Sequence, residues 1–122
     1  MTRNILPHKC LCSLWGLTSY SIYFKGKPAA VIVNCRRGGK SATFDQPNKY
    51  FTISNMVIVS SQYWNETHGF TANEQKKDLE RLQTMRTLGR NMAWLIKCIK
   101  LGKDYGVYFP ELESPVYINF IQ

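Results

Sequence analysis

Two short runs of apolar residues, each followed by a polar segment, organise the middle of the chain. The first run covers Ala29–Val33 and the second Met56–Ser61, and both are rich in β-branched residues. Runs of this kind are too short for a core helix and are typical of strands buried on both faces. About twenty residues with a helical pattern separate the two strands, so we predict a right-handed βαβ crossover that sets them parallel.

The joining segment, residues 41–53, is expected to form the crossover helix, with its aromatic residues facing the sheet. Pro47 lies in the middle of this segment. A proline in a helix interior costs about 3 kcal/mol, whereas one in the first turn is tolerated. We therefore predict that the helix begins near Asp45 and ends at Ser54.

A second, longer helix is predicted from about Ala72 to Leu101. Thr71 and Glu74 have the spacing of a capping box at its start, and Gly102 is a natural stop at its end. Gly89 in its middle predicts the close approach of another backbone. Apolar residues recur every three or four positions and predict a buried stripe, made of Leu79, Leu82, Met85, Leu88, Met92, Leu95 and Ile99.

The two ends of the chain carry weaker patterns. Within residues 1–24, one part has helical spacing and residues 19–24 alternate like a strand, so both alternatives stay open. Residues 110–122 contain two prolines and are expected to form an extended tail, in which Val116–Ile121 is a candidate edge strand. The chain thus divides into a divergent segment 1–24, a central portion 25–109 and the tail 110–122.

The charge of +8 is unevenly distributed. Residues 1–50 hold eight of the sixteen basic residues and only one acidic residue, which suits an anionic partner such as a phosphate-bearing cofactor, nucleic acid or a membrane surface. No run of apolar residues is long enough to span a membrane. The pair Cys10-x-Cys12 is too closely spaced for zinc and has no second ligand pair, so we predict no metal site and reduced thiols in a cytosolic protein.

The polar segments after the two strands hold the candidate ligand-binding residues. Asn34–Lys40 follows the first strand. We call its four central residues, Arg36-Arg37-Gly38-Gly39, the arginine loop. Ligands bind at the carboxyl ends of strands in open α/β sheets, and glycines let them approach the backbone. Tyr63 and Trp64 follow the second strand, and we expect them at the same edge, where they can stack on a planar ring. The alternatives are a solvated turn with two surface arginines and a Tyr-Trp pair that caps the core.

Several motifs together resemble the carboxyl-terminal part of the flavodoxin-like NADPH-dependent FMN reductases, which are allied to iron–sulfur flavoproteins. The resemblance covers residues 25–109. Its motifs occur in the following order: Gly26-Lys27-Pro28-Ala29-Ala30, the arginine loop, Phe44-Asp45-Gln46, Asn48-Lys49-Tyr50-Phe51-Thr52-Ile53-Ser54-Asn55-Met56, Val59-Ser60-Ser61-Gln62-Tyr63-Trp64-Asn65, His68-Gly69 and Gln83-Thr84-Met85-Arg86-Thr87-Leu88-Gly89-Arg90-Asn91-Met92-Ala93-Trp94-Leu95.

The resemblance implies an α/β fold of the flavodoxin-like class, with a parallel sheet and flanking helices. The sheet is expected to be incomplete, with two βα units and the long C-terminal helix, because the family's amino-terminal third and its phosphate-binding loop have no counterpart here. It further implies FMN as cofactor, NAD(P)H as reductant, and a cytoplasmic protein that forms oligomers or pairs with a full-length flavoprotein. The implied cofactor-binding residues are Asn34, Cys35, Arg36, Arg37, Gly38, Gly39, Tyr63 and Trp64. No catalytic residue is assigned.

Two functions therefore compete at the level of the sequence. The first is an FMN-dependent NAD(P)H oxidoreductase, or an N-terminally truncated remnant of one. The alternative is a non-catalytic basic module that contacts an anionic partner or a full-length flavoprotein subunit. Nucleic acid is the less favoured anion, because the basic residues are scattered and the aromatic residues lie mostly away from them.

Overall fold

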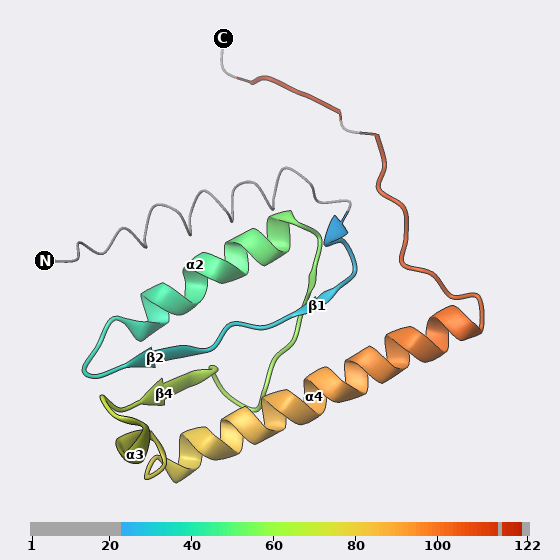
Figure 1. Cartoon of the computed structure of the whole chain (residues 1–122). Helices are drawn as coiled ribbons and strands as arrows, with labels where there is room; N and C mark the ends of the chain where they lie inside the picture. The colour runs from blue at the N-terminus through green and yellow to red at the C-terminus, as the bar shows by residue number, and fades with distance from the viewer. Residues whose placement is uncertain (1–22, 115, 121–122) are drawn as a thin grey trace, which may run out of the picture.

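The computed structural model describes residues 23–114 and 116–120, and it has a mixed α/β architecture with a long C-terminal helix (Figure 1). The predictions for residues 1–22, including Cys10 and Cys12, lie outside the described residues. The described elements, in chain order, are β1 (Pro28–Ala29), β2 (Val33–Cys35), α2 (Lys40–Ile53), β3 (Val57–Ile58), β4 (Glu66–His68), α3 (Ala72–Gln75) and α4 (Leu79–Asp104).

The predicted parallel pairing of the two apolar runs is confirmed. β1 pairs with β3 in parallel, with Pro28 opposite Val57 and Ala29 opposite Ile58, and α2 lies between them in the chain. Each run forms a shorter strand than predicted, because regular pairing stops after two residues. The expectation of burial on both faces is wrong, since Ile32 is 60% exposed between buried neighbours. The run alternates as a strand with one covered face does.

Two further strands, β2 and β4, follow β1 and β3 along the chain. They also pair with each other, and this second pairing was not predicted. β2 pairs in parallel with β4, with Val33 opposite Glu66, Asn34 opposite Thr67 and Cys35 opposite His68 (Figure 1). The sequence of β4 is entirely polar, so it gives no hydrophobic signal of a strand. Its polar side chains are paired within the fold, as described below.

α2 begins five residues earlier than predicted. It starts at Lys40, directly after Gly39, and Pro47 lies inside the helix. Gly39 has a φ of 85°, a left-handed conformation that glycine adopts without strain and that turns the chain from β2 into the helix. A proline removes one backbone hydrogen bond while the helix continues on both sides of it. The helix start is therefore set by Gly39 rather than by Pro47.

The predicted single helix from Ala72 to Leu101 is in fact two helices. The capping box is confirmed, because the Thr71 hydroxyl accepts from the Glu74 N–H and the Glu74 side chain accepts from the Thr71 N–H. It starts only the four-residue α3, and Asp78 then caps a new helix by accepting from the Arg81 N–H at 3.2 Å. A second N-cap so soon after the first was not recognised in the sequence.

The end of α4 also differs from the prediction. The helix continues through Gly102 to Asp104, and Gly106, with a φ of 80°, takes the position after the cap. The Gly106 N–H donates to Lys103 O at 3.0 Å and the Val107 N–H to Gly102 O at 2.8 Å, which is the Schellman pattern. Gly102 is therefore a helical residue whose carbonyl closes this turn.

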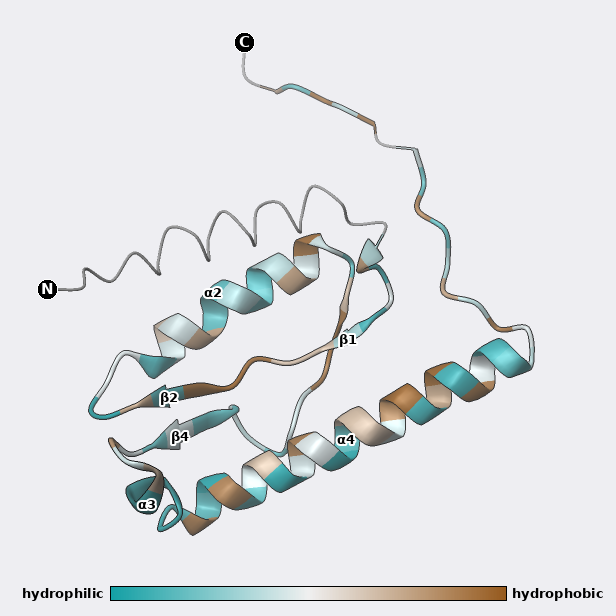
Figure 2. Ribbon diagram, in the orientation of Figure 1, coloured by the Kyte–Doolittle hydropathy of each residue, from teal (hydrophilic) through white to brown (hydrophobic). Residues whose placement is uncertain are grey.

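The hydrophobic core is small and lies where α4 crosses the strands. It consists of the buried apolar residues Ala29, Val31, Val33, Val59 and Leu88. The stripe predicted for α4 is only partly covered: Leu88 is its one fully buried member among the described residues, Leu79 is exposed, and the other five are half-buried. Apolar segments alternate along the helix in Figure 2. A Cβ on Gly89 would meet nothing within 4 Å, so the close backbone approach expected there is absent from the described part.

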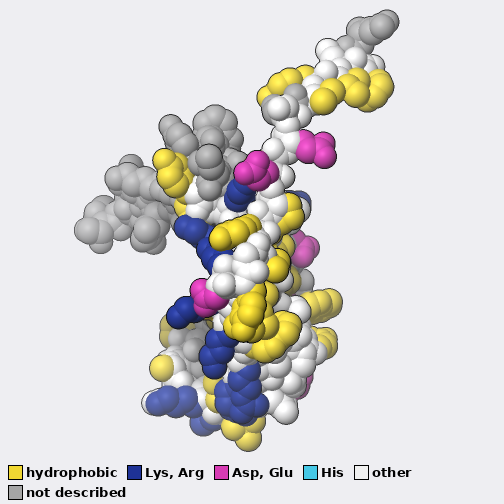
Figure 3. Space-filling model, turned by 90° about the vertical axis from the view of Figure 1, so that its right-hand side faces the viewer, with side chains coloured by type: hydrophobic (Ala, Val, Ile, Leu, Met, Phe, Trp, Pro, Cys, Tyr) yellow, Lys and Arg dark blue, Asp and Glu magenta, His cyan; other side chains and the backbone are white. Residues whose placement is uncertain are grey.

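The chain after α4 is extended and exposed, as predicted. It leaves the body of the molecule with hydrophobic side chains along it (Figure 3), among them Tyr117 and Phe120, which are 90% and 88% exposed. Residues 116–120 form no strand, so the edge strand proposed for Val116–Ile121 is not formed in the residues that are described. Across all the described residues, no helix combines the length and the apolar character that a membrane span requires.

Candidate functional site

The arginine loop lies at the carboxyl end of β2 and leads directly into α2. Its four residues are exposed. Gly39 is the N-cap residue of α2 and forms no side-chain cap. A Cβ on Gly38 or Gly39 would meet no atom within 4 Å, so the backbone of the loop is open to the outside. A planar or anionic group can therefore approach it closely.

The end of β4 lies beside this loop and supplies the other wall of the site. The Gly69 N–H donates to the Cys35 carbonyl at 3.2 Å, and the Asn34 side-chain amide donates to the Gly69 carbonyl at 3.1 Å. The guanidinium carbon of Arg36 is 4.8 Å from the centroid of the Phe70 ring. These contacts join the segment that follows β2 to the segment that follows β4.

Gly69 cannot be replaced easily at this position. Its φ is 142°, and a Cβ there would lie 2.8 Å from the Gln75 side chain and 2.9 Å from the Gln75 N. α3 thus packs directly against the turn that follows β4. Between these segments lies a cavity of about 420 Å³, whose lining is Arg36, His68, Gly69, Phe70, Glu74 and Asp78.

A buried ion pair fixes the start of α2 to β4 beneath the arginine loop. The Lys40 Nζ lies 3.1 Å from the Glu66 Oε2, with the two side chains 15% and 2% exposed. The Ser41 hydroxyl donates to the other Glu66 oxygen at 3.3 Å. Because a buried carboxylate is stable only when it is paired, this arrangement accounts for a polar strand inside the fold.

His68 extends the same network toward the surface. Its Nδ1 lies 3.2 Å from the Lys40 Nζ, and because an ammonium group only donates, Nδ1 accepts this bond. Asp78 accepts the His68 backbone N–H at 3.3 Å, and its carboxylate is 3.7 Å from Nδ1. Lys40, Glu66, His68 and Asp78 thus form a continuous polar network, which holds the arginine loop between two fixed elements.

Tyr63 and Trp64 are not brought beside the arginine loop. They precede β4, where the Asn65 carbonyl accepts the Val33 N–H at 3.0 Å, so they lie at the start of β2 rather than at its end. Their rings are 5.4 Å apart, and the guanidinium carbon of Arg81 is 4.8 Å from the Tyr63 ring centroid. The expectation that this pair shares the edge of the arginine loop is therefore wrong.

The reason is β4 itself. This strand runs from the start of β2 to its end, so the residues that reach the edge of the arginine loop are His68, Gly69 and Phe70. They take the place expected for the Tyr-Trp pair. The other predicted residues, Asn34, Cys35 and the arginine loop, are together at the edge. A weak signal for His68–Phe70 existed in the sequence, namely a histidine followed by a glycine and an aromatic residue. No signal marked the Lys40–Glu66 pair.

Comparisons with known proteins add no assignment to this site. No family model matches the chain, and no curated protein or solved structure gives a significant match. Within the described residues there is also no cluster of three or more potential metal ligands. The chemistry of the site therefore has to be argued from its own residues.

Proposed function

We propose that this chain is the part of a flavodoxin-like, FMN-dependent NAD(P)H oxidoreductase that contacts the flavin ring. The observation that carries the proposal is the open arginine loop at the carboxyl end of a parallel strand, which is where open α/β sheets bind their ligands. The motif resemblance over residues 25–109 supports the same function. The described α/β architecture, with parallel strands and a long final helix, is compatible with it.

The residues at this edge fit a flavin ring system. The open backbone at Gly38 and Gly39 gives a flat group room to approach, since no atom lies within 4 Å of either Cβ position. Arg37 is exposed and has no partner among the described residues, so its guanidinium is available to the carbonyl-rich edge of the ring or to a phosphate of the nicotinamide donor. Asn34 and Cys35 end the strand that carries the loop.

The protein's own contribution is to hold these donors in place. When bound, FMN supplies the hydride chemistry. The Lys40–Glu66 pair fixes the end of the loop that enters α2, and the Phe70 ring holds the Arg36 guanidinium. Arg37 is left to provide positive charge where electron-rich, reduced flavin requires it.

A flavin titration tests this proposal. Free FMN is added to the purified chain and its fluorescence is followed, with Arg37→Gln compared with Lys49→Gln, which removes an exposed cation from α2. Because a hydrogen bond to a charged group contributes about 1.5–3 kcal/mol, Arg37→Gln is expected to weaken binding at least about tenfold. Lys49→Gln is expected to bind as the parent does. The absence of any flavin binding by the parent chain would refute the proposal.

A second candidate function rests on the uncovered face of α4. Trp94, Leu101 and the cap residue Tyr105 follow one side of the helix and are each more than half exposed, and large exposed apolar surfaces are typical of interaction sites. On this reading the chain is an assembly module that pairs with another flavoprotein subunit. Sedimentation of the chain, alone and with Trp94→Glu, separates the two: a monomer that binds FMN favours the first function, and an assembly lost in the variant favours the second.

A further inference from the structure

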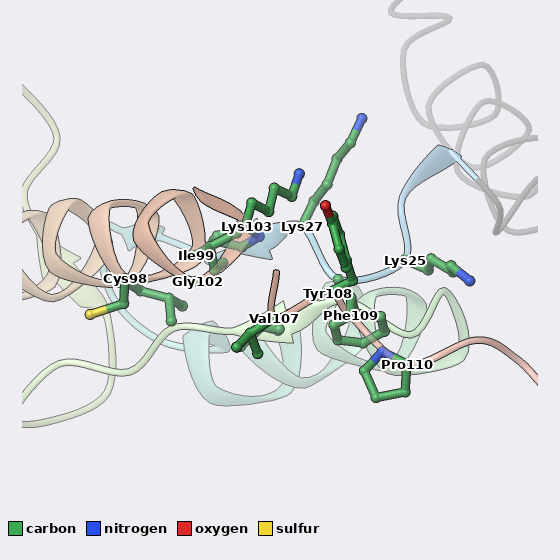
Figure 4. Close-up of a pocket in the computed structure, with 14 residues that line it drawn as sticks. Lys25, Lys27, Cys98, Ile99, Gly102, Lys103, Val107, Tyr108, Phe109 and Pro110 are labelled. Atoms are coloured by element: carbon green, nitrogen blue, oxygen red, sulfur yellow. The ribbon is translucent and has the colours of Figure 1, made fainter. Parts of the chain in front are cut away.

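A second pocket lies at the opposite end of the strands from the arginine loop. It has a volume of about 550 Å³ and is formed by the amino end of β1, the last turns of α4 and residues 107–110 (Figure 4). Its interior is mainly apolar, and the residues that make it so are Pro28, Val57, Leu95, Ile99, Val107 and Phe109. This volume is within the range of pockets that bind small molecules.

The wall contributed by residues 107–110 is held by specific contacts. The Schellman turn at the end of α4 fixes Val107 through the bond from its N–H to the Gly102 carbonyl. The Phe109 ring packs against Gly26, so closely that a Cβ on Gly26 would lie 2.6 Å from it. The pocket is therefore built by two glycine-dependent contacts and does not depend on the free tail beyond them.

The rim of the pocket is basic. Lys25, Lys27 and Lys103 contribute to its lining, and no acidic residue does. None of the three lysines has an ion-pair partner in the part of the chain that is described. Figure 4 shows Lys27, Lys103 and the Tyr108 hydroxyl extending to the same side of the pocket, and Figure 3 shows hydrophobic and basic side chains next to one another on this side of the molecule. An apolar interior with an unpaired cationic rim is complementary to an amphiphilic anion.

We propose that this pocket binds a fatty carboxylate, with its alkyl chain against the apolar wall and its carboxylate at Lys27 and Lys103. A carboxylate accepts hydrogen bonds from ammonium groups and from a phenolic hydroxyl, and these are the polar groups on that side of the pocket. Because the apolar wall has no group that recognises the end of the alkyl chain, the pocket accepts alkyl chains of different lengths up to its volume. This site is separate from the arginine loop and does not rest on the proposed flavin function.

Cys98 provides a direct readout, because it lines the pocket and is exposed, whereas Cys35 lies outside it. Decanoate is added to the chain, a limiting amount of iodoacetamide follows, and peptide mass spectrometry gives the alkylation rate of each cysteine. We expect decanoate to slow alkylation of Cys98 about fivefold or more, as access to the thiol is blocked, and to leave Cys35 unchanged.

Two comparisons test the role of charge. Lys27→Gln/Lys103→Gln is expected to require at least about tenfold more decanoate for the same protection, whereas Lys97→Gln/Lys100→Gln, which removes two cations of α4 outside the pocket, is expected to have no effect. Neutral 1-decanol is expected to protect far less than decanoate. Circular dichroism is used to check that each variant retains its helices.

Three results would overturn the proposal. Unprotected Cys98 in the presence of decanoate would exclude occupancy of the pocket. Equal protection of Cys35 and Cys98 would show a detergent-like effect on the whole chain. Equal protection by decanol and decanoate, unaffected by Lys27→Gln/Lys103→Gln, would show that the rim recognises no anion.

Discussion

Replacing Lys40 by methionine tests the pair that holds the candidate flavin site together. The substitution keeps most of the apolar stem of the side chain but removes the ammonium that lies 3.1 Å from the Glu66 carboxylate. Glu66 is 2% exposed, and among the described residues its carboxylate would keep only the Ser41 hydroxyl as a partner. The variant therefore leaves a buried charge uncompensated, and it also removes the Lys40–His68 hydrogen bond.

The structure sets the size of the effect. Breaking a buried ion pair by removing one partner costs about 3–5 kcal/mol, and the 15% exposure of Lys40 points to the lower end of this range. We therefore expect Lys40→Met to lower the free energy of unfolding by about 3 kcal/mol. Such a loss is a large part of the 5–15 kcal/mol that is typical of a small domain.

Urea unfolding followed by circular dichroism measures this loss, and two further variants complete the test. Lys49→Met makes the same change at an exposed position of α2 and is expected to change stability by less than about 0.5 kcal/mol. Lys40→Met/Glu66→Gln removes both charges and is expected to recover part of the loss of Lys40→Met. Equal losses for Lys40→Met and Lys49→Met, or no recovery in the double variant, would show that the pair does not stabilise the fold.

Three further substitutions test the packing around this site, each by urea unfolding. Gly69→Ala places a Cβ against the backbone of α3 and is expected to cost about 1–3 kcal/mol, whereas Gly38→Ala, in open space, is expected to be neutral; similar costs would contradict the geometry of the turn. Leu88→Ala, at a site 5% exposed, is expected to cost about 2–5 kcal/mol and Leu79→Ala, 72% exposed, less than about 0.5 kcal/mol, so equal losses would refute the assigned core. Thr71→Ala removes the cap of α3 and is expected to cost about 1 kcal/mol, and an unchanged midpoint would show that α3 contributes nothing.

The sequence predicted the features of the fold that depend on local chemistry. The β-branched runs gave the parallel pairing of β1 with β3, and Thr71 and Glu74 gave the capping box. The α/β class and the long final helix followed from the same patterns. The apolar runs and the capping box are each visible within a short window of the sequence. The parallel pairing of β1 with β3 then followed from the helical pattern between the two runs.

Most of the features that were missed depend on contacts between distant residues, whereas the cap at Asp78 is a local contact. β4 is polar and is stabilised as a strand by Lys40, which lies twenty-six positions earlier, so no window of the sequence contains the cause. The position of Tyr63 and Trp64 followed from overlooking that strand. The break before α4 was missed because the apolar periodicity hid the second cap at Asp78.

The candidate site could be predicted on one side only. A basic, glycine-containing loop after an apolar run is recognisable by its composition, whereas the facing wall formed by His68 and Phe70 depends on the register of β2 with β4. The relation of the loop to FMN rests on the motif resemblance and is a prediction. The described geometry adds an open backbone and an unpaired Arg37 to it.

The most direct test of the central claim is a map of the amide signals that FMN perturbs, recorded by ¹⁵N-resolved nuclear magnetic resonance. We predict that saturating FMN shifts the signals of residues 36–39 and of 68–70, because these two segments form the edge that we propose for the flavin ring, and leaves the indole signal of Trp64 unchanged. Shifts confined to the Tyr63–Trp64 turn, or an unchanged spectrum, would contradict a flavin site at the arginine loop.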